Sequence, residues 1–135
     1  MDVPVASAME RDNSSVGCET GITSLCIQGR FRVEASWQTA SGVRVAAAGV
    51  PLTSRSGYFW FFSPSNAELI VKTVDACSIG QGQWFFAAGM TTVGVELRVT
   101  DTFTGETRTY ANPPDTAFSP IQDTSAFSFC PTPTP

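Results

Sequence analysis

The stretch "GRFRVEASWQT", residues 29–39, alternates apolar and polar side chains. Phe31, Val33, Ala35 and Trp37 share one side, whereas Arg30, Arg32, Glu34 and Ser36 share the other. Side chains of a β-strand point alternately to its two faces, so this period of two predicts a strand with one buried face. The stretch "TVGVELRVTD", residues 92–101, has the same alternation and predicts a second such strand.

The rest of the chain carries further signals for short strands. "AELIVKTVDAC" (67–77) and "GQWFFAAG" (82–89) are apolar runs bounded by turn residues, and Thr104-Gly105 marks a tight hairpin. "VRVAAAGVPL" (43–52) predicts a weaker strand, which Pro51 restricts to an edge or a bulge. Strands punctuated by turns every eight to twelve residues are typical of β-sandwiches. We therefore expect an all-β fold, an antiparallel β-sandwich that is immunoglobulin-like or jelly-roll-like and stapled by disulfides.

The length of 135 residues fits one domain with a substantial core. We expect an N-terminal tail over residues 1–17, a single β-sandwich domain over 18–130, and a Pro/Thr tail or linker over 131–135. Residues 1–17 lack the basic start and the apolar core of a secretory signal peptide, so none is expected in this chain.

The four cysteines, Cys18, Cys26, Cys77 and Cys130, are spread along the chain without a C-x-x-C pair. An even number with this spacing predicts two disulfides and a secreted, extracellular protein, and the alternative is four buried free thiols. The positions of the cysteines relative to the expected strand ends favour the disulfides Cys26–Cys77 and Cys18–Cys130.

Charge and composition exclude several classes of function. The formal net charge is −4, and the arginines are scattered, which argues against nucleic-acid partners. No apolar run is long enough to cross a bilayer, so we expect no membrane insertion. The chain contains no His, which removes Ser-His-Asp catalysis and zinc sites that require imidazole.

Five consecutive aromatic residues in "SGYFWFFSP" (56–64) form the most unusual feature. On an extended chain Tyr58, Trp60 and Phe62 share one side, and Phe59 and Phe61 share the other. They are either the two faces of a buried strand, or one side is a stacking surface for a ligand or partner. Trp37 and Trp84 present the same choice, with the core favoured for both. The candidate binding residues are Tyr58, Trp60, Phe62 and Trp84.

Carboxylates provide only weak candidates for chemistry. Asp75, Asp101 and Asp123 lie at strand ends or in loops and could contribute to a Ca²⁺ site, although no D-x-D-x-D-G loop is present. A pair of catalytic carboxylates for glycoside hydrolysis could come only from Glu34, Glu68 or Glu96. The residues around each of them are typical of a solvent-exposed strand face. We therefore expect neither an enzyme, nor a cofactor, nor a bound metal.

Four segments together resemble an uncharacterised domain of secreted bacterial proteins: "LCIQGRFRVEASW" (25–37), "VPLTSRSGYFWFFSPSNAELIVKTVDAC" (50–77), "FTGETRTYANP" (103–113) and "FSPIQDTSAF" (118–127). They cover about two thirds of the chain in the same order and spacing. Ala76 stands where that group usually has Gly before the cysteine. The resemblance implies a signal peptide upstream, disulfides and a β-sandwich, and it implies no established activity.

These observations together predict a non-catalytic extracellular structural or binding module. The low charge and the two-sided aromatic strands favour either self-association or binding to another protein. Self-association would give a surface assembly or a filament, and exchange of a terminal strand between copies is one way to form it. Two alternatives stay open. One is a carbohydrate-binding module with an aromatic platform, and the other is a protease inhibitor with a rigid loop at Pro51 or at Pro113-Pro114.

Overall fold

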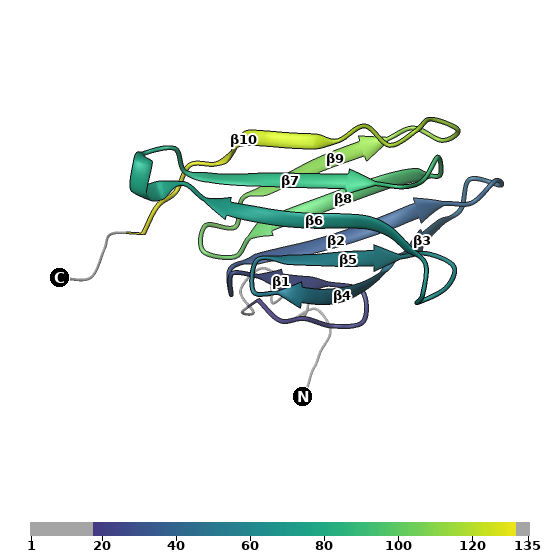
Figure 1. The fold of residues 1–135 in the computed structure, drawn as a ribbon, viewed down its shortest axis with the longest axis horizontal. Helices are drawn as coiled ribbons and strands as arrows, with labels where there is room; N and C mark the ends of the chain where they lie inside the picture. The colour runs from purple at the N-terminus through teal and green to yellow at the C-terminus, as the bar shows by residue number, and fades with distance from the viewer. Residues whose placement is uncertain (1–17, 132–135) are drawn as a thin grey trace.

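A computed structural model describes residues 18–131. This part of the chain forms ten strands and one short 3-10 helix, η1 (Cys77–Ile79). The strands make two antiparallel sheets stacked as two layers (Figure 1), which confirms the predicted all-β sandwich. The predicted tail over 1–17 and residues 132–135 of the predicted C-terminal tail lie outside the described residues.

The first sheet is built around the two stretches with the clearest alternation. Its strands are β1 (Leu25–Ile27), β2 (Phe31–Gln38), β3 (Arg44–Ala46), β8 (Gly94–Asp101) and β9 (Thr107–Asn112). Strands β2 and β8 pair along their whole length, from Phe31 opposite Asp101 to Gln38 opposite Gly94. The alternation thus places the apolar residues of both strands on one side of the sheet, where they are buried.

The second sheet has the order β10-β7-β6-β5-β4. Its strands are β4 (Ala48–Thr53), β5 (Ser56–Trp60), β6 (Ala67–Asp75), β7 (Gln83–Gly89) and β10 (Ile121–Phe127). Strand β4 lies at the edge, and its register with β5 shifts between Pro51 and Thr53. Pro51 thus lies both on an edge strand and at a bulge, the two positions predicted for it. The reason is that proline has no backbone N–H to donate to a neighbouring strand.

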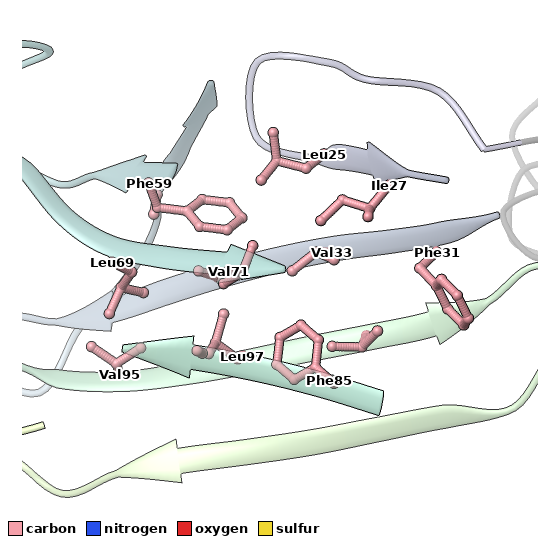
Figure 2. Packing of buried hydrophobic residues seen from close by; sticks show 14 of the residues in the cluster. Leu25, Ile27, Phe31, Val33, Phe59, Leu69, Val71, Phe85, Val95 and Leu97 are labelled. Atoms are coloured by element: carbon pink, nitrogen blue, oxygen red, sulfur yellow. The ribbon is translucent and has the colours of Figure 1, made fainter. Parts of the chain in front are cut away.

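The core fills the space between the two sheets (Figure 2). Phe31, Val33 and Leu97 of the first sheet meet Phe59 and Phe85 of the second, and each of these side chains is completely buried. Because the buried residues alternate with outward ones along each strand, the sandwich has two outer faces as well as one core.

Gly57 allows β1 to approach the second sheet closely. A Cβ atom at this position would lie 2.6 Å from Leu25 Cδ1 and 2.9 Å from the carbonyl oxygen of Val50. We expect Gly57→Ala to lower the free energy of unfolding by about 1–3 kcal/mol, because the backbone oxygen cannot move away from an added methyl group. Gly21→Ala is the matched control, since its Cβ would meet only Ser24 Oγ at 3.4 Å. Equal stability of the two variants in urea denaturation would contradict this account.

All four cysteines form disulfides, as predicted, but the expected pairing is wrong. The bonds are Cys18–Cys26 and Cys77–Cys130, with Cα–Cα distances of 5.3 and 5.8 Å. Cys26 lies between Leu25 and Ile27, which are both buried, so its side chain points out of the first sheet and away from Cys77. Cys130 follows β10, which pairs with β7, and β7 begins shortly after Cys77.

Candidate binding face

The outer face of the second sheet is rich in aromatic side chains. Tyr58 and Trp60 on β5, and Trp84 and Phe86 on β7, are half-buried and point away from the core. Ile70 on β6 lies between them, directly opposite Tyr58, and its side chain is 47% exposed. We call this surface the aromatic face, and its members are Val50, Tyr58, Trp60, Ile70, Lys72, Val74, Trp84, Phe86, Ala88 and Gln122.

A shallow groove of about 390 Å³ runs across the aromatic face between β5 and β10. Its apolar lining includes Ile70, Phe86 and Ala88. Its polar lining includes Ser56, Lys72 and Gln122. A concave, mostly apolar surface with a few polar groups is the usual composition of a ligand site.

Polar contacts fix the orientation of several side chains on this face. The Tyr58 hydroxyl donates to the carbonyl of Pro64 at 3.3 Å, and the Trp84 indole N–H donates to the carbonyl of Gln81 at 3.1 Å. The ammonium group of Lys72, the only lysine of the chain, lies 5.6 Å from the centre of the Phe86 ring. The rings of Trp84 and Phe86 are 17° from parallel, with centres 6.1 Å apart. These contacts therefore hold the rings of Tyr58, Trp84 and Phe86 in place.

Three of the four predicted binding residues lie on the aromatic face, and the fourth does not. Tyr58 and Trp60 are together on β5, and Trp84 is two strands away on β7. The expectation that Phe62 shares their side is wrong, because β5 ends at Trp60 and the chain bends there. Phe62 is 58% exposed and packs edge-on against Trp37, with ring centres 4.7 Å apart.

The prediction that Trp37 and Trp84 lie in the core is confirmed for Trp37 and wrong for Trp84. Trp37 packs against the core, as expected. Trp84 lies on the outer face, because its neighbour Phe85 occupies the buried side of β7. Sequence reasoning missed Ile70, Lys72, Phe86 and Gln122 as groove residues, although the alternation in "AELIVKTVD" (67–75) would have placed the first two on one face.

The outer face of the first sheet is different in character. Its outward side chains on the two central strands are charged or polar, and Glu34 lies directly opposite Arg98. Members of this face are Arg32, Glu34, Ser36, Glu96, Arg98 and Thr100. The sandwich therefore has one polar outer face and one aromatic outer face. Glu68, in contrast to Glu34 and Glu96, is buried in the second sheet and accepts a hydrogen bond from Asn66 at 3.0 Å.

The most strongly buried charges form an ion pair at one end of the sandwich. Arg30 Nε and Nη2 donate to the two carboxylate oxygens of Asp101 at 2.8 and 2.7 Å. Arg30 also donates to the carbonyl of Phe129 at 2.9 Å, and its guanidinium lies 4.7 Å from the ring centre of Phe103. This pair therefore joins the start of β2, the end of β8 and the segment after β10. The prediction that Arg30 lies on the polar side of its strand is wrong.

Each of the three calcium candidates is engaged by neighbouring groups. Asp75 accepts from the Cys77 amide and from Gln83, whereas Asp101 holds Arg30. Asp123 accepts from the Tyr110 hydroxyl at 2.7 Å, and burial together with this hydrogen bond raises the pKa of Tyr110. Among residues 18–131, no three Asp, Glu, Cys or His side chains gather as a metal site would require.

The two disulfides are compatible with a secreted domain. Across the described range, 18–131, no helix has the length and apolar character needed to cross a membrane. A scan against protein-family models and searches of the curated proteins and of the solved structures find no match to this chain.

Proposed function

We propose that this protein is a non-catalytic, secreted binding module that holds carbohydrate in the groove of the aromatic face. The observation that supports this proposal most is the composition of that groove. The Phe86 ring provides an apolar wall, and Lys72, Gln122 and Ser56 provide hydrogen-bonding groups beside it.

A sugar ring matches such a lining for a simple physical reason. One side of the ring presents C–H groups that pack on an aromatic surface, and its rim presents hydroxyl groups that need hydrogen-bond partners. The groove combines both kinds of group within one shallow and open surface, which a polymer chain could enter from the side.

The test is binding to an array of immobilised glycans, compared between the wild type and two groove variants. We expect Phe86→Ala to weaken binding by about tenfold or more, because the stacking surface is lost. Lys72→Gln should weaken it less, because it changes one exposed polar group and leaves the apolar wall in place. Glu96→Gln, on the opposite outer face, is the matched control and should bind like the wild type. An array without a bound glycan, or Phe86→Ala binding as tightly as the wild type, would exclude the proposal.

A second candidate function is self-association through the same face. It is supported by the apolar surface outside the groove, which contains Tyr58, Trp60 and Trp84. These side chains are partly exposed to solvent, and no other segment of residues 18–131 covers them. Aromatic side chains of this kind dominate protein interfaces. Cys77–Cys130 ties the segment after β10 to η1 of the same chain, which favours a contact between faces over exchange of β10.

Native mass separates the second candidate from the first. If copies meet through the aromatic face, the oligomer should dissociate when Ile70 is replaced by Glu, since the new charge would be buried in the contact. A particle whose mass does not change with Ile70→Glu is not held together by this face.

A further inference from the structure

Most edges of the two sheets carry a feature that prevents pairing with another strand. At the β4 edge, Pro51 and a register shift interrupt the ladder, and the Gly49 amide donates to the carbonyl of Ile22 at 2.9 Å. At the β10 edge, the register shifts between Asp123 and Phe127. Such interruptions are a common way to protect sheet edges from edge-to-edge association.

The remaining edge of the first sheet, formed by β1 and β3, is also protected. Each of these strands has only three residues, and the Cys26 amide on β1 is already bonded to Thr20 Oγ1 at 3.1 Å. Strand β9 is different. It pairs with β8 over six consecutive positions without a shift, contains no proline, and has no strand on its other side among the described residues.

The hydrogen bonding of the β8–β9 turn shows which groups of β9 are free. The Asp101 amide donates to the carbonyl of Glu106 at 2.8 Å. In an antiparallel pair, backbone groups of successive residues point alternately toward and away from the neighbouring strand. The amides and carbonyls of Thr107, Thr109 and Ala111 therefore point outward, and all three residues have exposed side chains. The carbonyl of Thr107 accepts from the guanidinium of the neighbouring Arg108 at 3.1 Å, and within residues 18–131 the other outward amides and carbonyls have no backbone partner.

We propose that β9 pairs antiparallel with β9 of a second copy of this chain, with Thr109 opposite Thr109. This register places Thr107 opposite Ala111 and uses the full length of the outward edge. On the outer face of the sheet, the paired side chains of Thr107, Thr109 and Ala111 are small and uncharged, and every outward amide finds a carbonyl.

Charge complementarity supports this occupant and this register. Arg108 would lie opposite Tyr110 of the second copy, whose hydroxyl is bonded to the carboxylate of Asp123. The arginine of each copy thus approaches the half-buried carboxylate of Asp123 in the other, twice by symmetry. In the single chain, Arg108 lies over the Phe127 ring at 5.1 Å and 4.0 Å from Glu106, so it is already at this border of the molecule.

The contact has a geometric consequence for the aromatic face. The two-fold axis of an antiparallel edge contact stands perpendicular to the sheet, so the aromatic faces of both copies point to the same side. Because the same strand is used by both copies, the contact closes as a dimer and does not propagate into a filament. A dimer of this kind would present two grooves to one extended ligand, which increases avidity without new contacts.

The register can be tested by introducing single cysteines along the edge. In the full chain, Thr109→Cys should form a covalent dimer under mild oxidation, since opposed residues in such a pair are about 5.5 Å apart. Thr107→Cys is the matched control and should not do so, because its counterpart lies about four residues away along the strand. Peptide mapping would verify that the native disulfides are intact. Equal cross-linking of both variants would overturn the register, and no cross-linking of either would overturn the contact.

Native mass provides a second readout that does not depend on thiol chemistry. We expect light scattering to give twice 14.4 kDa for the wild type at high concentration. Thr109→Pro removes only an outward amide, and Thr109→Lys brings two cations together at the axis, so both should give the monomer mass. Thr53→Lys, on the β4 edge, is the control and should keep the dimer mass. A wild-type monomer up to about 1 mM, or a dimer that persists in both Thr109 variants, would refute the proposal.

Discussion

Replacing Asp101 by Asn is expected to lower the free energy of unfolding by about 3–5 kcal/mol. Arg30 is only 4% exposed, and Asp101 is fully buried. Without the carboxylate, the guanidinium would remain in the protein interior with no opposite charge, and removal of one partner from a buried pair costs more than the pair itself contributes. The ion pair spans 71 positions of sequence, so its loss should also loosen the contact between the β8–β9 turn and the segment after β10.

Denaturation in urea, followed by tryptophan fluorescence, measures this effect. The matched control is Glu106→Gln on the same hairpin, because Glu106 forms only an exposed pair with Arg108 at 4.0 Å. An exposed pair of this kind contributes about 0–1 kcal/mol at most. If both variants lose the same small amount, the Arg30–Asp101 pair does not stabilise the fold in the way inferred.

The effect of Asp101 should depend on pH with a definite sign. Burial raises the pKa of this carboxyl, but the hydrogen bonds from Arg30 and the Phe103 amide, together with the Arg30 charge, outweigh it and leave the pKa below its ordinary value of 3.8. A lowered pKa in the folded state adds stability that is complete above the ordinary value and is lost as the pH falls through the folded value. The difference between the wild type and Asp101→Asn should therefore shrink as the pH falls below about 4. A difference that grows toward acid pH would contradict this assignment.

Removal of Cys77–Cys130, by replacing both residues with Ser, is expected to lower the free energy of unfolding by about 4 kcal/mol. This bond closes a loop with a sequence separation of 53, whereas Cys18–Cys26 closes one of only 8. In the chain-entropy model a longer loop restricts the unfolded state more. The expected loss in free energy of unfolding on removal of Cys18–Cys26 is therefore smaller, about 2.5 kcal/mol.

The two double replacements are controls for each other. Both remove one disulfide and two sulfur atoms, so a difference in urea midpoint at equal slope reports the loop and its surroundings. The longer loop also holds the end of β10 beside η1, at the same end of the sandwich as the Arg30–Asp101 pair. A larger loss after removal of Cys18–Cys26 would show that the N-terminal segment around β1 is the more important anchor.

The sequence by itself determined the strands and their buried sides. The alternation in 29–39 and 92–101 became the central pair β2–β8, and Pro51 became an edge and a bulge, as expected. These features are local, because the pleat of a strand assigns neighbouring residues to opposite faces wherever the strand is placed. The number of disulfides was also predictable from the count and spacing of cysteines.

Only the tertiary structure decided which residues meet across the fold. The cysteine pairing and the Arg30–Asp101 ion pair depend on contacts between segments far apart in sequence, and no local pattern specifies them. The aromatic run 56–64 showed that strand β5 has two apolar sides, but not which side would face the core. That choice follows from the register of the second sheet, which buries Phe59 and leaves Tyr58 and Trp60 on the outer face, because one layer can pack only one of its sides against the other.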